Sequence, residues 1–128
     1  MGQKILAIDD NIEFLGTLKD ILEDKGYDVT TLADPVKAEH YINKYTPDLL
    51  IIDVFMPERS GFNLVEDFNE RGLYGSIPKI FLTCLDDDVE RMTARACGVA
   101  QYLTKPFQPE DLLDLVELTL VLDRKKEA

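Results

Sequence analysis

The sequence has little of what several large classes of protein require. Its 128 residues include only two cysteines, Cys84 and Cys97, and one histidine, His40. The cysteines have no metal-ligand spacing, and no serine, cysteine or second histidine lies near His40 in the chain. We therefore expect free thiols that are at least partly buried, and a histidine on an exposed helix face.

Positive charge and long apolar runs are also scarce. Lysine and arginine total 14 against 25 acidic residues, which gives a formal net charge of -11. Such a chain repels phosphate backbones, so we expect no direct binding of nucleic acid. No apolar run approaches the ~20 residues of a spanning helix, and the start, MGQKILAIDD, lacks a secretory leader. We therefore expect a cytoplasmic protein without a membrane segment.

What the sequence does contain is an alternation of short apolar runs with helical patterns. The apolar runs predict strands at Lys4–Ile8, Tyr27–Leu32, Asp48–Ile52, Pro78–Leu82 and Val99–Leu103. Helices are predicted after Asn11, from Asp34–Pro35, around Phe62, from Asp86–Asp88, and from Gln108–Pro109 to about Leu122.

This alternation predicts an α/β fold, a doubly wound parallel sheet of five strands with five helices on its two faces. For such a sheet we expect the flavodoxin-like strand order 2-1-3-4-5. The whole chain, residues 1–128, is then one domain, and the charged end, residues 123–128, is a tail or the start of a linker. Ligands of these sheets bind at the carboxyl ends of the strands.

Polar residues follow the predicted strands and should meet at one rim. Asp9 and Asp10 follow the first strand, Asp53 the third, Thr83 the fourth and Lys105 the fifth. At an effective dielectric of ~20, two carboxylates ~4 Å apart repel by roughly 4 kcal/mol, so such a cluster raises a pKa or holds a cation. Hard oxygen ligands that face water favour Mg²⁺ or Mn²⁺.

Phosphoryl transfer is the chemistry that these side chains suit. Lys105 supplies a point charge and Thr83 a hydroxyl donor, and each can contact one phosphoryl oxygen while the cation contacts the third. Transfer needs mostly positioning and charge neutralisation of this kind. Carboxylates are known covalent acceptors, so Asp53, at the centre of the rim, is the predicted nucleophile.

Four motifs in order resemble the response-regulator receiver domains of two-component signalling, the CheY-like family. They are IDD at Ile8–Asp10, DLLIIDVFMPERSG at Asp48–Gly61, FLT at Phe81–Thr83 and GVAQYLTKPF at Gly98–Phe107. Each motif alone is weak, but together they cover essentially the whole chain. The resemblance implies a phosphorylatable signalling switch rather than an enzyme with its own substrate.

The resemblance also assigns roles by position. Asp53 matches the phosphoacceptor and, with Asp10, a direct metal ligand, whereas Asp9 matches a ligand that acts through water. Phe55 lies where a backbone carbonyl completes the metal site. Lys105 matches the lysine that pairs with the phosphoryl group, and its bond to the following proline resembles the family's cis peptide.

The switch and the partners are implied in the same way. Thr83 and Tyr102 match the switch pair, whose hydroxyl moves to the phosphoryl group while the ring turns inward. The implied phosphodonor is a histidine kinase or a histidine phosphotransfer protein. Phe55 and Leu85 are apolar at the two variable positions that flank the site. Neither positions a water for attack, so we expect slow self-dephosphorylation.

The last predicted helix has more apolar residues than one core stripe needs. The stripe expected to face the sheet is Leu112, Leu113, Val116 and Leu120, and a second strip is Leu115, Leu118 and Leu122. A wide core face explains the second strip, and so does a surface for a homodimer or a downstream partner. In this family the output face is commonly formed by helix four, strand five and helix five.

Two alternatives remain beside a stand-alone receiver domain. One is a receiver module from a larger DNA-binding regulator or hybrid kinase. The other is a haloacid-dehalogenase-like phosphatase, which also uses an aspartate nucleophile, Mg²⁺ and a lysine. Those enzymes have Asp-x-Asp after the first strand, whereas here Asp9 and Asp10 are adjacent and Asn11 follows. The complete set of rim residues also argues against a degenerate receiver that is never phosphorylated.

Overall fold

The computed structural model describes residues 2–85, 87–99 and 101–126, and these form one parallel sheet between two layers of helices. The strands are β1 (Lys4–Ile8), β2 (Asp28–Leu32), β3 (Leu49–Asp53), β4 (Lys79–Thr83) and β5 (Gln101–Thr104). Their order is β2-β1-β3-β4-β5, and all neighbouring pairs are parallel. The predicted flavodoxin-like order is confirmed.

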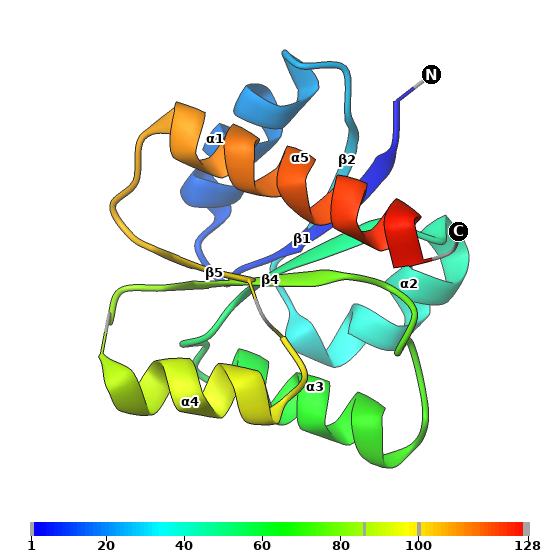
Figure 1. The fold of residues 1–128 in the computed structure, drawn as a ribbon, viewed down its shortest axis with the longest axis vertical. Coiled ribbons are helices and arrows are strands. Elements are labelled where there is room, and N and C mark those ends of the chain that lie inside the picture. Colours follow the sequence, from blue (N-terminus) through cyan, green and yellow to red (C-terminus); the bar gives the residue numbers. More distant parts are fainter. Residues whose placement is uncertain (1, 86, 100, 127–128) are drawn as a thin grey trace.

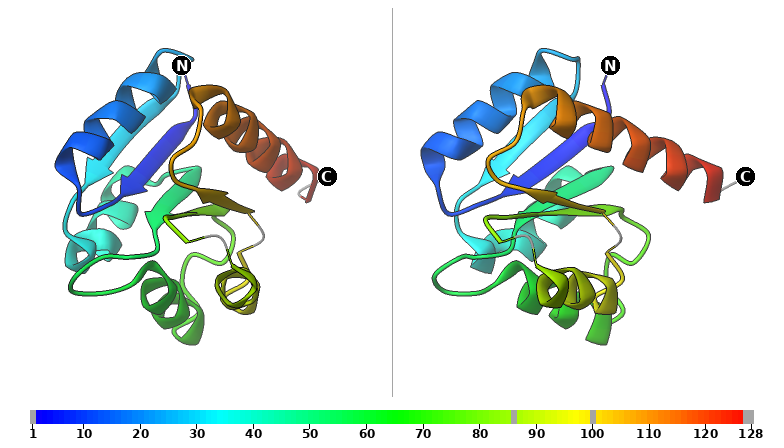
Figure 2. Two further views of the ribbon diagram at one scale, coloured as in Figure 1. Left: turned by 90° about the vertical axis from the view of Figure 1, so that its left-hand side faces the viewer. Right: turned by 60° about the vertical axis from the view of Figure 1, so that its left-hand side comes forward.

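Helices cover both faces of the sheet. Figure 1 shows α1 (Ile12–Glu23) and α5 (Pro109–Lys126) on one face. On the other face are α2 (Ala38–Tyr45), α3 (Gly61–Glu70) and α4 (Asp88–Ala96), and the turned views of Figure 2 show the same layers. Each face has its own hydrophobic core. Within the described ranges, no helix is both long enough and apolar enough to cross a membrane.

The two predicted helix caps are present. The Asn11 side chain accepts a hydrogen bond of 3.1 Å from the N–H of Phe14, and Asp34 accepts one of 3.0 Å from the N–H of Val36. The predicted helix after Asp34 begins as a 3-10 turn, η1 (Pro35–Lys37), before α2. These caps satisfy N–H groups that the first helical turn leaves without a partner.

Several boundaries differ from the predicted ones. Strands β3 and β4 end at Asp53 and Thr83, because Asp53 still pairs with Leu82 and Thr83 with Thr104. Both side chains are therefore held by the sheet itself and not by a loop. The fifth helix runs past its predicted end to Lys126. Three predicted features include residues outside the described ranges: the acidic helix start at position 86, the fifth strand at position 100 and the tail at 127–128.

One of the two cysteine predictions is wrong. Cys97 is buried under α4, as expected, and His40 is exposed, but Cys84 is exposed as well. Thr83 points into the interior at the end of β4, and successive side chains of an extended chain point to opposite sides. Cys84 therefore faces outward.

Candidate phosphoacceptor and metal site

Three carboxylates meet at the carboxyl end of the sheet. One oxygen from each of Asp9, Asp10 and Asp53 lies within 4.8 Å of the other two. Strands β1 and β3 are neighbours, and Ile8 pairs with Ile52, so the residues that follow these two come together. Asp9 and Asp53 are buried whereas Asp10 is exposed, which leaves one side of the cluster open to water.

Lys105 lies between the two buried carboxylates. Its Nζ donates to Asp9 Oδ2 at 2.8 Å and is 3.3 Å from Asp53 Oδ1. The backbone N–H of Lys105 donates to the carbonyl of Thr83 at 2.6 Å, which continues the β4–β5 pairing as far as the rim. The bond from Lys105 to Pro106 is a cis peptide, as the family resemblance implies. The structure thus brings Lys105 to the predicted rim.

The pKa values of this cluster follow from burial and from like charge. Burial raises the pKa of Asp53 to about 6, and the negative charge of Asp9 adds to the effect, while Lys105 opposes it. Burial lowers the pKa of Lys105, but its hydrogen bond to Asp9 and the charges of Asp53 and Asp9 outweigh burial and raise it overall. The ammonium therefore stays protonated, and Asp53 ionises near pH 6.

The donor set fits a hard divalent cation. Above the pKa of Asp53, three carboxylates and one ammonium leave the cluster with two uncompensated negative charges. Carboxylate oxygens with one side open to water match Mg²⁺, which keeps several waters and prefers to share its ligands with phosphate. The chemistry of these residues is therefore consistent with the metal that the family resemblance implies.

The predicted switch residues, Thr83 and Tyr102, both bond the backbone of Leu85. Thr83 is fully buried, and its Oγ1 accepts a hydrogen bond of 3.1 Å from the N–H of Leu85. The carbonyl of the same Leu85 accepts a hydrogen bond of 2.5 Å from the Tyr102 hydroxyl. Thr83 and Tyr102 therefore bond the two polar backbone groups of the same residue, Leu85.

Gly61 supports the site, and the sequence argument assigned it no role. A Cβ atom at this position would lie 2.5 Å from the carbonyl oxygen of Asp53 and 3.0 Å from a methyl group of Ile52. The Gly61 N–H donates to the carbonyl of Val54 at 2.9 Å. Only glycine lets α3 begin this close to the end of β3. The glycine in the motif DLLIIDVFMPERSG was the available signal.

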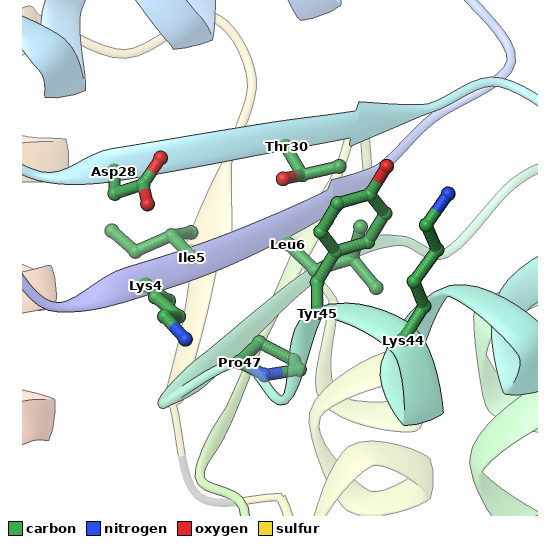
Figure 3. Close-up of a pocket in the computed structure, with 8 residues that line it drawn as sticks. All are labelled: Lys4, Ile5, Leu6, Asp28, Thr30, Lys44, Tyr45 and Pro47. Atoms are coloured by element: carbon green, nitrogen blue, oxygen red, sulfur yellow. The ribbon is translucent and has the colours of Figure 1, made fainter.

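Two hollows of the surface lie at opposite ends of the strands. A hollow of about 190 Å³ beside the rim is lined by Asp10, Asp34 and Glu58, among others. This volume holds several waters. Of the predicted site residues its lining includes Asp10, but not Asp53, Thr83 or Lys105. A hollow of about 200 Å³ lies at the opposite end of β1 and β2, where Tyr45 stands beside the strands (Figure 3). It includes none of the predicted site residues.

The predicted partner strip on α5 divides in two. Leu118 and Leu122 are exposed, at 49% and 41%, but Leu115 is half-buried and packs against the core. The core stripe is as predicted, with Leu112, Val116 and Leu120 buried and Leu113 packed against them. On α4, across the edge strand β5, Val89 and Met92 are also exposed.

Comparison with known proteins agrees with this fold. Residues 5–117 match the model of the response regulator receiver domain, and the chain belongs to this family. It is 30% identical over 120 residues to the regulatory protein VanRc of Enterococcus gallinarum, covering 94% of this chain and 51% of that protein. It is 32% identical over 108 residues to the aerobic respiration control protein ArcA of Escherichia coli (strain K12), covering 84% and 44%.

Solved structures show the same likeness. The chemotaxis protein CheY4 of Vibrio cholerae aligns with a TM-score of 0.86 at 33% identity, over 93% of this chain and 99% of that one. A CheY-like receiver domain protein from Methanospirillum hungatei aligns with a TM-score of 0.89 at 26% identity, over 98% and 99%. The chain spans about half the length of the two curated relatives named above.

Proposed function

We propose that this receiver domain accepts a phosphoryl group on Asp53. The observation that carries the proposal is the convergence of three carboxylates and one ammonium at the end of β3, with Asp53 at their centre. Such a group of charges is costly unless a cation and an anion are its normal ligands. Asp9, Asp10 and Asp53, with the carbonyl of Phe55, would hold Mg²⁺ or Mn²⁺.

In this proposal an Asp53 carboxylate oxygen attacks phosphorus and forms an acyl phosphate. The bond from phosphorus to the donor's imidazole nitrogen breaks, and the imidazole takes up a proton from solvent. When bound, the cation supplies positive charge to one phosphoryl oxygen. Lys105 transfers its contact from Asp53 to a second oxygen, and the Thr83 hydroxyl donates to the third.

The switch follows from the link through Leu85. When the Thr83 hydroxyl turns to the phosphoryl group, the N–H of Leu85 loses its acceptor and the backbone at Leu85 rearranges. Tyr102 bonds the carbonyl of Leu85, so its ring responds to the same movement. Phosphorylation at the rim would in this way change the surface around α4, β5 and α5.

The partners of this switch are also proposals. The phosphodonor would be a histidine kinase or a histidine phosphotransfer protein. The exposed Leu118 and Leu122, together with Val89 and Met92, form the surface proposed for a second copy or a downstream protein. The curated relatives are about twice as long as this chain. A receiver module within a longer regulator is therefore as consistent with the comparisons as a single receiver domain over 1–128.

Labelling by a small phosphodonor tests the central proposal. The purified chain is incubated with acetyl phosphate with and without Mg²⁺, and modified peptides are mapped by mass spectrometry. We expect one added phosphoryl group on the peptide with Asp53, only when Mg²⁺ is present, and none in Asp53→Asn. Asp34→Asn, which changes an acid of the neighbouring hollow, is the matched control and should be labelled normally. Label that persists in Asp53→Asn would refute the proposal.

A further inference from the structure

The Lys105 ammonium has a third neighbour besides the two carboxylates. Its Nζ lies 4.0 Å from the centre of the Phe14 ring, a distance at which an ammonium is attracted to the ring face. Phe14 belongs to the first turn of α1, far in the sequence from the motif that contains Lys105. No feature of sequence spacing links the two residues.

Phe14 is itself held from two sides. Its N–H donates to the side chain of Asn11, whose own N–H donates to Asp9 Oδ1 at 2.9 Å. The Phe107 ring meets the Phe14 ring edge-on, with 6.0 Å between centroids and 76° between planes. Lys105 also donates to Asp9 Oδ2. Asp9, Asn11, Phe14 and Lys105 are therefore linked by a cyclic set of contacts.

We propose that Phe14 is a positioning residue for phosphoryl transfer, whose ring holds the Lys105 ammonium at the rim while the lysine exchanges Asp53 for a phosphoryl oxygen. This inference rests on the proposed function of Asp53. The attraction of a cation to a ring face has no fixed hydrogen-bond direction, unlike a bond to a carboxylate oxygen. The ammonium can therefore move between two oxygen partners without leaving the ring.

A lysine particularly needs such a support. Its four-carbon side chain loses considerable rotamer freedom when its charge is fixed, and its ammonium is strongly hydrated. The contact with Phe14 covers one side of the ammonium, and the Lys105 side chain is only 23% exposed. Phosphoryl transfer depends mainly on such positioning, so a displaced ammonium should slow the reaction. The ammonium is not a ligand of the cation, so its displacement should not weaken cation binding.

The test compares Phe14→Leu, which keeps an apolar side chain without the ring face, with Phe14→Tyr, which keeps the ring. Phe62→Leu is the matched control, because Phe62 lies in the first turn of α3 and makes an edge-on contact with Phe81. We expect labelling of Asp53 by acetyl phosphate at saturating Mg²⁺ to slow about three- to tenfold in Phe14→Leu. Phe14→Tyr and Phe62→Leu should retain the wild-type rate, and the Mg²⁺ affinity of Phe14→Leu should be unchanged.

Nuclear magnetic resonance gives a readout that needs no phosphodonor. The ring current of Phe14 should shift the methylene protons beside the Lys105 ammonium upfield in the wild type and in Phe14→Tyr, and the shift should vanish in Phe14→Leu. Unshifted protons in the wild type, or equal labelling rates in wild type and Phe14→Leu, would overturn this inference alone. Absence of Mg²⁺-dependent label on wild-type Asp53 would overturn the proposed function and this inference with it.

Discussion

At the residue scale, the raised pKa of Asp53 links the candidate site to the stability of the fold. The pKa is about 6 in the folded chain against 3.8 for an exposed aspartate, so the folded state binds more protons between these two values. The free energy of unfolding therefore falls as pH rises through this window, and above it the ionised Asp53 destabilises the metal-free protein.

Asp53→Asn removes this cost. Without Mg²⁺ and near neutral pH, we expect the variant to be more stable than the wild type by about 1 to 2 kcal/mol, because the open side of the rim lets water screen part of the effect. Urea unfolding at a series of pH values measures the difference. The advantage should disappear below about pH 4, where the carboxyl is protonated in both states. A difference that stays constant with pH would contradict the assignment.

The two apolar neighbours of the site lead to a second prediction at this scale. Phe55 and Leu85 are exposed at 43% and 44%, and neither has a polar group to hold a water against an acyl phosphate. The phosphorylated wild type should therefore decay slowly. The double variant Phe55→Asn, Leu85→Glu should shorten the half-life about tenfold, which corresponds to a barrier lower by about 1.4 kcal/mol. Decay after removal of the donor, followed by phosphate-affinity electrophoresis, measures it.

The outcome that would contradict this prediction is a wild-type half-life as short as that of the double variant. Val36→Asn is a suitable control. Val36 is apolar and 69% exposed in η1, so the change alters surface polarity away from the two flanking positions. It should leave the decay rate unchanged.

At the scale of elements, local sequence signals predicted the strands and helix caps well, whereas contacts between segments distant in sequence were not predicted. The apolar runs and the caps Asn11 and Asp34 are local signals. The five strands begin and end within two residues of their predicted bounds, and both caps are present. Ile12 has the right spacing for a core position, yet it is 74% exposed because it begins α1 at the edge of the rim. Spacing along a helix defines a face but not where the neighbouring layer ends.

The candidate site shows the same division. Strand ends and motif order predicted the meeting of Asp9, Asp53 and Lys105, since the topology of a parallel sheet brings strand ends together. The ring of Phe14 above Lys105 was not predicted, because it depends on how α1 and the β5–α5 loop pack in three dimensions. The close approach of Gly61 to Asp53 likewise depends on packing.

Helix α5 provides the prediction that belongs to this scale. Leu118 is 49% exposed on the side of α5 away from the buried stripe, so a charge there costs little in the monomer. If this surface binds a second copy or a partner, Leu118→Glu should abolish association and change the free energy of unfolding by no more than about 0.5 kcal/mol. Sedimentation of phosphorylated protein, with urea unfolding of the same sample, measures both.

The control for this experiment is Val36→Glu, the same kind of change at an exposed apolar residue on the opposite edge of the sheet. It should leave association intact. A large loss of stability in Leu118→Glu would show instead that the strip belongs to the core. The Leu115 side chain packs against the core cluster, so Leu115→Glu should be clearly destabilising.

At the scale of the whole molecule, the net charge of -11 and the acidic rim act together. The long-range field of an acidic chain attracts cations, and the cluster of three carboxylates gives them one place to bind. Mg²⁺ bound to the folded state alone should raise the stability of the entire domain, by about 1.4 kcal/mol at ten times its dissociation constant. Thermal unfolding in MgCl₂ against NaCl of equal ionic strength separates binding from screening.

The pH dependence of this stabilisation is the sharper part of the prediction. A cation competes with the proton on Asp53, so its apparent affinity should be constant above the pKa of about 6 and fall up to tenfold for each pH unit below it. Asp10→Asn should weaken the stabilisation at every pH, whereas Asp34→Asn, beside the same hollow, should not. Equal stabilisation of wild type and Asp10→Asn would mean that Mg²⁺ acts through the overall charge and not through this site.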